Sequence, residues 1–397
     1  MNRILKKDLE VKVLSTEEDF KATCEYFSRD ELWRKVRGNE LHSIGYSDVP
    51  ILAEQLIEES GVESMDAFLE GMSETGIFTQ IPSLDGSHME TYAGRYTSYV
   101  SMYNRSGTNC RMITTVMPKS KIAALSAEER GKEIDRGWST TKENLSIYIV
   151  DSKISYFGSD KYVILSYLDG FNAVKDMLKE AYPKAEYITG QVSYEYIFGE
   201  WRLHADEEEI YKLLFKETGK DLENISFLLR YSSSNVGNAK MAARLFLEID
   251  DIRIPIGHSQ NIWHRIDKRV EDKGDLDSDN GCEMDDFKTK LGWVGKIFKE
   301  NEDLLKILAH TPILHPAGCL KQLLMECRLI PSIYRKTVIE EMDVEWGNNP
   351  CTALDVYSKA SSVINFADTP TKIVLITDEI AELQFKNFLL YDKDLDE

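Results

Sequence analysis

The chain has 397 residues, of which 42% are hydrophobic, and this size and composition suit a folded protein of two or three domains. Its 68 acidic and 48 basic residues give a formal net charge of −20, which excludes a protein that coats nucleic acid by bulk electrostatic attraction. An acidic surface fits ordinary solubility, a basic protein partner or mimicry of a nucleic-acid backbone, so any contact with a polyanion must be local.

Residues 1–88 are predicted to form a helical N-terminal region. A short alternating run at 10–14 is followed by Ser15, Thr16 and Glu18, which resemble a capping box, and a helix is expected from there to about Arg37. Two further helices are expected at 49–59 and 64–72, the first of them with Pro50 in its first turn.

Residues 89–265 are predicted to form a β-rich core. Polar or glycine-containing connections separate short apolar runs here, which is typical of antiparallel hairpins. The expected elements are two strands within 89–117, a helix from Pro118 to about Arg136, strands at 145–150 and 154–157, a helix at 168–182, strands at 192–198 and 201–204 that turn at Gly199 and Glu200, a helix at 206–216, and a three-stranded meander at 225–231, 241–249 and 252–256.

An acidic linker at 266–283 is expected to separate this core from a helical C-terminal region at 284–397. Phe287, Leu291, Val294 and Phe298 follow helical spacing, which predicts one long helix over 284–308. Further helices are expected at 317–329, 332–342 and 350–366, and the segment 372–390 is expected to begin as a strand at 373–376. The predicted class is therefore α+β, with an antiparallel β-rich centre between two helical regions.

The connection between the first two meander strands is the main candidate binding site. It is rich in serine, asparagine and glycine and is flanked by three cations, a combination that can bind phosphate through backbone and side-chain donors. The alternative is a tight β-connection whose serines hydrogen-bond their own backbone. We expect the connection to be exposed. The candidate residues are Arg230, Ser232, Ser233, Ser234, Asn235, Gly237, Asn238, Lys240 and Arg244.

A second candidate is a divalent cation site in the acidic run. Asp275, Asp277, Asp279 and Asp286 occupy the first, third, fifth and twelfth positions of an EF-hand-like loop, although Gly281 falls one position late. The alternative is a solvated inter-domain linker. No other cofactor is expected.

The sequence shows no signature of a catalytic nucleophile or of a zinc site. The six cysteines include no C-x-x-C pair, and there is no G-x-S-x-G motif, so a catalytic site would have to be assembled from distant residues. Tyr92, Tyr96, Tyr99 and Tyr103 could stack nucleic-acid bases or, alternatively, cover one face of a sheet. No run approaches the roughly 20 apolar residues that span a bilayer, and we expect a cytoplasmic protein with no membrane contact.

Residues 145–390 resemble a family of phage- and plasmid-encoded proteins of unknown function. The similarity lies in the run from Tyr162 to Leu165, in the strands up to Trp201, in Arg230 to Gly237 and in Asn349 to Ala353. The usual continuation of the family after the meander, an arginine and a cysteine-threonine-asparagine stretch, is missing here. The resemblance implies an origin in a mobile element and no established chemistry.

Three functions remain open from these observations. The first is an accessory protein of a phage or mobile element that acts by binding, either through a local nucleic-acid contact in DNA metabolism or by engaging a host protein. The second is a metal-dependent enzyme that acts on nucleotides or nucleic acid with carboxylates from distant segments. The third is an acidic counter-defence inhibitor that mimics nucleic acid. The sequence does not specify an oligomeric state.

Overall fold

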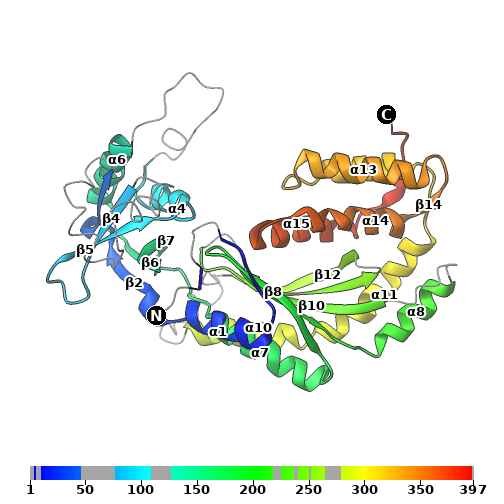
Figure 1. Ribbon diagram of the computed structural model, residues 1–397, viewed down its shortest axis with the longest axis horizontal. Helices are drawn as coiled ribbons and strands as arrows, with labels where there is room; N and C mark the ends of the chain where they lie inside the picture. Colours follow the sequence, from blue (N-terminus) through cyan, green and yellow to red (C-terminus); the bar gives the residue numbers. More distant parts are fainter. Residues whose placement is uncertain are drawn as a thin grey trace, which may run out of the picture.

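The protein is seen in a computed structural model, which describes residues 4–5, 10–45, 77–108, 127–217, 225–236, 240–249, 252–263 and 279–395. Within these ranges the fold is α+β, which confirms the predicted class. Two six-stranded sheets lie side by side, and helices from the last third of the chain cover one face of one of them, which we call the main sheet (Figure 1). The expected helices at 49–59 and 64–72 and most of the expected acidic linker lie outside the described residues.

The main sheet has the strand order β1-β8-β9-β10-β11-β12, and all of its neighbouring strands are antiparallel. Because side chains alternate across a strand, Phe227, Leu229 and Tyr231 all face the same side, where each is fully buried. The strands are β1 (Lys12–Leu14), β8 (Glu186–Val192), β9 (Ile197–Arg202), β10 (Ile225–Ser233), β11 (Met241–Ile249) and β12 (Ile252–Ile262). The last three strands confirm the predicted meander.

Helices cover both faces of the main sheet. The face that carries Phe227 packs against α1 (Glu17–Phe27), α7 (Tyr167–Ala181), α10 (Asp279–Leu291) and α11 (Val294–His310), as Figure 1 shows. Next to α11 lies α8 (Glu207–Glu217). On the opposite face, α14 (Ala353–Ser361) and α15 (Pro370–Leu383) contact β12. The helices α12 (Pro316–Met325) and α13 (Ser332–Trp346) pack on α14, farther from the sheet. The short strands β13 (Pro312–Ile313) and β14 (Cys351–Thr352) pair with each other.

The second sheet has the order β2-β6-β7-β5-β4-β3, in which only the β5–β7 pair is parallel. One face of this sheet packs against two helices, and Trp138 and Phe157 are fully buried where the sheet and the helices meet. The strands are β2 (Trp33–Arg37), β3 (His42–Gly45), β4 (Ile77–Pro82), β5 (Met89–Gly94), β6 (Asn144–Val150) and β7 (Lys153–Ser159), and the helices are α4 (Ser98–Arg105) and α6 (Ala127–Thr140). The β6–β7 hairpin was predicted. The described part of residues 1–88 thus supplies strands to both sheets.

The predicted strand that contained four tyrosines is wrong in its second half. Tyr99 and Tyr103 lie on helix α4, with their rings stacked 5.7 Å apart, because a spacing of four residues places two side chains on one helical face. Tyr92 alone of the set lies within a strand, β5. The four tyrosines therefore form no single stacking platform of the kind that would bind nucleic-acid bases.

The predicted turn at Gly199 and Glu200 is also wrong, since both residues lie inside β9 and pair with β8. Glycine is needed at 199 for close packing: a Cβ there would lie 2.8 Å from the Phe20 ring. The true turn lies between β8 and β9, where Ser193 N–H donates to the Tyr196 carbonyl at 2.8 Å.

Three expected helix and strand boundaries in the rest of the chain differ from the structure. Helix α1 ends at Phe27 and β2 follows, so the expected helix to Arg37 is too long. The single helix expected over 284–308 is two helices, α10 and α11, because Gly292 interrupts the helical run. The expected strand at 373–376 is part of α15, which Thr369 caps and Pro370 begins.

Candidate functional site

The serine-rich segment at the end of β10 and in the turn after it is buried at the junction of the two sheets. Ser232, Ser233, Ser234 and Asn235 are 4%, 0%, 0% and 2% exposed. The expectation of an exposed turn is therefore wrong for these residues, because the turn packs into the body of the protein and its polar groups bond to neighbouring segments. Gly237 and Asn238 lie outside the described residues.

Asn235 joins three segments of the chain. Its N–H donates to the Tyr167 hydroxyl at 2.8 Å, and its carbonyl oxygen accepts a hydrogen bond from the Tyr162 hydroxyl at 3.2 Å. Its side-chain Nδ2 donates to the carbonyl of Phe27 at 3.4 Å. These contacts hold neighbouring segments together, so the role of the turn is structural.

The tip of the β6–β7 hairpin fastens the second sheet to the main sheet beside this turn. Asp151 and Ser152 have φ values of 51° and 59°, as a type I′ turn requires. The Asp151 carboxylate accepts hydrogen bonds from the hydroxyls of Tyr26 and Tyr194, the latter at 2.5 Å. The Arg95 guanidinium lies 3.5 Å from the centre of the Tyr194 ring. We name these contacts around Asp151 the inter-sheet clasp.

Arg230 is committed to a buried ion pair on the face of the main sheet below α15. Its guanidinium donates to the Glu200 carboxylate at 2.6 and 2.7 Å and to the Thr377 hydroxyl of α15 at 3.1 Å. Arg253 approaches the same carboxylate at 2.6 Å. Burial lowers the pKa of Arg230 below its usual value, although attraction to Glu200 opposes this. Arg230 therefore links the sheet to the helix.

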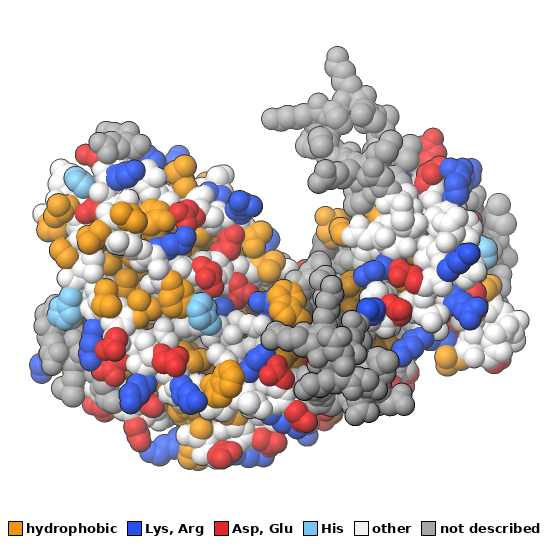
Figure 2. All heavy atoms as spheres, turned by 180° about the vertical axis from the view of Figure 1, so that it is seen from behind, with side chains coloured by type: hydrophobic (Ala, Val, Ile, Leu, Met, Phe, Trp, Pro, Cys, Tyr) orange, Lys and Arg blue, Asp and Glu red, His pale blue; other side chains and the backbone are white. Residues whose placement is uncertain are grey.

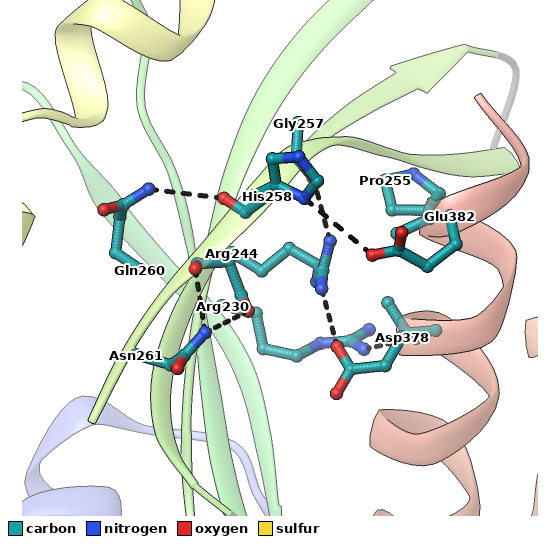
Figure 3. A network of polar contacts seen from close by, with 12 residues as sticks. Arg230, Arg244, Pro255, Gly257, His258, Gln260, Asn261, Asp378 and Glu382 are labelled. Carbon is teal, nitrogen blue, oxygen red and sulfur yellow. Dashed lines mark hydrogen bonds and ion pairs between the residues drawn. The ribbon is translucent and has the colours of Figure 1, made fainter. Parts of the chain in front are cut away.

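Arg244 makes a second link to the same helix. Its guanidinium donates to the Gly257 carbonyl at 3.1 Å and to the Asp378 carboxylate at 2.6 Å (Figure 3). The Lys240 ammonium lies 4.4 Å from the centre of the exposed Trp263 ring. Because Arg230 and Arg244 are buried and are each paired with a carboxylate, these two cations are not presented together with Lys240 as a free anion site.

Opposite Arg244, strand β12 bulges outward. The pairing of β11 with β12 shifts between Ala243 and Leu245, and Gly257 has a φ of +61°. The Gly257 N–H donates to Gln384 Oε1 at 2.9 Å. The bulge places the His258 ring against the Phe385 ring, with centres 4.4 Å apart. His258 Nδ1 lies 3.8 Å from the Glu382 carboxylate (Figure 3).

The EF-hand-like spacing does not form a calcium loop over its second half. Helix α10 begins at Asp279, so the backbone from Asp279 to Asp286 is helical and rises about 10 Å, which is not the loop that an EF-hand requires there. The Asp286 carboxylate pairs with Lys290 at 2.7 Å. Asp275 and Asp277 lie outside the described residues. In the part of the chain that the structure describes, no three His, Cys, Asp or Glu side chains are grouped to hold a metal ion.

A surface feature that the sequence did not reveal lies on the C-terminal lobe, by which we mean residues 294–395. Of the 16 large apolar side chains that are exposed in the described ranges, 10 lie between Ile307 and Leu390. Figure 2 shows hydrophobic side chains gathered on the side of the molecule that holds the C-terminal helices. Met325 and Leu329 are four residues apart, as are Phe385 and Leu389. Buried helix faces show the same spacing, so the sequence alone does not indicate that these side chains are exposed.

No family model, no curated protein and no solved structure matches this chain. The resemblance to phage- and plasmid-encoded proteins therefore stays a prediction. None of the helices described here combines the length and the apolar character needed to cross a membrane.

Proposed function

We propose that this protein acts by binding a protein partner through its C-terminal lobe, as an accessory protein of a phage or other mobile element that engages a host factor. The observation that carries the proposal is the concentration of exposed apolar side chains on this lobe. Soluble proteins seldom expose contiguous apolar surface, and where they do it commonly serves as an interaction site.

The buried state of the serine-rich turn supports a binding surface elsewhere. Arg230 and Arg244 hold α15 against the sheet, and Asn235 joins the two sheets. Binding a partner at Arg230 would require breaking its buried ion pair with Glu200, which costs several kcal/mol. The exposed apolar side chains of the lobe require no such opening.

A capture experiment with a matched control tests this function. Leu329 and Leu390 are exposed on the lobe, and Leu84 is exposed at the turn between β4 and β5 of the second sheet. We expect the tagged protein to capture a host protein that the L329S/L390S double variant captures at least tenfold less well, while L84S captures it normally. Equal capture by the double variant and the wild type would contradict a function of this lobe in binding.

A further inference from the structure

Five exposed side chains of the C-terminal lobe form what we call the apolar patch. Met325, Leu329, Phe385, Leu389 and Leu390 are 64%, 52%, 44%, 56% and 70% exposed. They come from the end of α12 and the loop after it, and from the segment that follows α15. These two segments are about 60 residues apart in the chain, so their proximity has to be shown by contacts.

A polar cluster holds the two segments together. The Glu326 carboxylate accepts hydrogen bonds from the Lys386 ammonium and from the Tyr391 hydroxyl, each at 2.6 Å. Met325 directly precedes Glu326 in the chain. In the same way Phe385 precedes Lys386, and Leu390 precedes Tyr391. Three patch residues therefore flank one polar cluster and belong to one neighbourhood of the surface.

Leu329 is held beside the C-terminal part of α15, the helix that precedes the second segment. The Glu379 carboxylate of α15 accepts the backbone N–H groups of Arg328 and Leu329, both at 2.8 Å. The His258 ring of β12 lies against the Phe385 ring. Since both segments are fixed by hydrogen bonds, a partner that docks here meets a surface that needs little further ordering, and this favours affinity.

Carboxylates outnumber cations around the patch. Glu326, Glu379 and Glu382 lie beside it, against Lys386 and Arg328, and this balance favours a basic partner. Glu382 is largely exposed and has His258 as its neighbour at 3.8 Å, while the exposed Lys386 ammonium is already paired with Glu326. The whole chain carries a formal charge of −20. A second copy of the chain would bring like charges together across the interface, whereas a basic partner would be attracted.

We propose that the apolar patch is the docking site for a basic protein segment that presents apolar side chains between lysines or arginines. This inference rests on the proposed function and specifies the partner's chemistry. Apolar anchors of the segment would cover Leu329, Phe385 and Leu390, and its cations would lie near Glu382 at the rim. Apolar anchors with a charged rim are the usual composition of such interfaces.

Two synthetic peptides test the partner's chemistry with the full-length protein. One places leucines at helical spacing among lysines, and the other replaces every lysine with glutamate. We expect the lysine peptide to bind, its Kd to rise with salt, and the glutamate peptide to bind at least tenfold more weakly. Equal binding of the two peptides would overturn the choice of a basic partner.

Variants then place the binding site. We expect L329S/L390S to bind the lysine peptide at least tenfold more weakly than the wild type, and E382K about threefold to tenfold more weakly. V344S, at an exposed position of α13 outside the patch, is the control and should bind the peptide as the wild type does. Unchanged peptide binding by L329S/L390S would show that the apolar patch is not the binding site. If that variant loses capture of the host protein while both peptides bind wild type equally, the proposed function stands and the basic partner is rejected.

Discussion

Glu200 shows how a single buried carboxylate determines the role of the residues around it. It lies on β9 with no exposed surface and is contacted by the guanidinium groups of Arg230 and Arg253. A carboxylate in such a position remains charged only when cations and hydrogen bonds replace the water that it has lost. The two arginines are therefore required by Glu200, and this requirement explains why Arg230 points into the protein.

Replacement of Arg230 by methionine tests this requirement. R230M keeps most of the side-chain volume but leaves Glu200 with one cation, and it also removes the hydrogen bond to Thr377 of α15. We expect a loss of about 3 kcal/mol in the free energy of unfolding, measured by urea denaturation. K336A breaks only an exposed pair with Glu340 and should cost less than about 0.5 kcal/mol. Losses of similar size in the two variants would contradict the role of Glu200.

Glu248, on the same face of the main sheet as Glu200, makes the stability of the protein depend on pH. Burial alone would raise the pKa of Glu248, but hydrogen bonds from Arg202 and Ser226 lower it below its usual value of 4.5 in the folded protein. A carboxyl with a lowered folded pKa stabilises the protein above its unfolded pKa, and this stabilisation is lost as the pH falls through the folded pKa.

We therefore expect acid to destabilise the wild type more than E248Q as the pH falls below about 4.5, the ordinary pKa of glutamate. At neutral pH E248Q should be less stable by about 1–2 kcal/mol, since its amide forms weaker hydrogen bonds. Denaturant midpoints measured for both proteins across this pH range provide the comparison. Parallel pH profiles would show that Glu248 does not contribute.

At the scale of single elements, helix α7 packs unusually close to the main sheet. A Cβ at Gly170 would lie 2.3 Å from the Tyr231 hydroxyl and 2.7 Å from the Met241 sulfur. In an exposed helix a change from glycine to alanine stabilises by up to about 1 kcal/mol, but here the added methyl group would push the helix away from β10 and β11. We expect G170A to destabilise the protein by about 1–3 kcal/mol, measured as a lower Tm.

Gly295, near the start of α11, provides the matched control. A Cβ there would have its nearest neighbour, the Tyr182 hydroxyl, at 3.9 Å, which is ordinary contact distance. G295A should therefore leave Tm unchanged or raise it slightly. If both alanine variants raised Tm, the close approach of α7 to the sheet would be disproved.

For the whole molecule, the sequence predicts the strands of the meander but not what surrounds them. The alternation of apolar residues in β10 is a local signal, and it correctly located this strand and its neighbours. The burial of Arg230 and Asn235 depends on partners far along the chain, such as Thr377, which is 147 residues from Arg230. A local sequence pattern does not indicate such distant partners, so the polar turn was predicted to be exposed to solvent.

The apolar patch was missed for the related reason that exposure is also a property of the whole molecule. Leu329 and Leu389 occur in runs whose spacing resembles that of core helices such as α14, whose Val356 is fully buried. Only the assembled lobe shows which apolar faces remain uncovered. The same limit applied to Gly199, where the sequence alone does not distinguish a turn from close packing against Phe20.

We expect the inter-sheet clasp to determine whether the two sheets unfold together. The Asp151 carboxylate accepts hydrogen bonds from Tyr26 and Tyr194 of the main-sheet unit, and Arg95 of the second-sheet unit lies over the Tyr194 ring. D151N retains a side chain that tolerates positive φ but removes the charge and one of the two acceptor oxygens. We expect this variant to lose about 1–3 kcal/mol of stability.

The loss should appear as weaker coupling between the sheets. Calorimetry of D151N is expected to give a broader transition or two resolved ones, and hydrogen exchange should accelerate in β6 and β7 before it does so in β10 and β11. D160N, at an exposed position in the turn after β7, is the control and should melt as the wild type does. An unchanged single transition in D151N would contradict this role and assign the coupling instead to neutral contacts between the sheets, such as the hydrogen bonds from Tyr162 to Asn235 and from Tyr148 to Phe27.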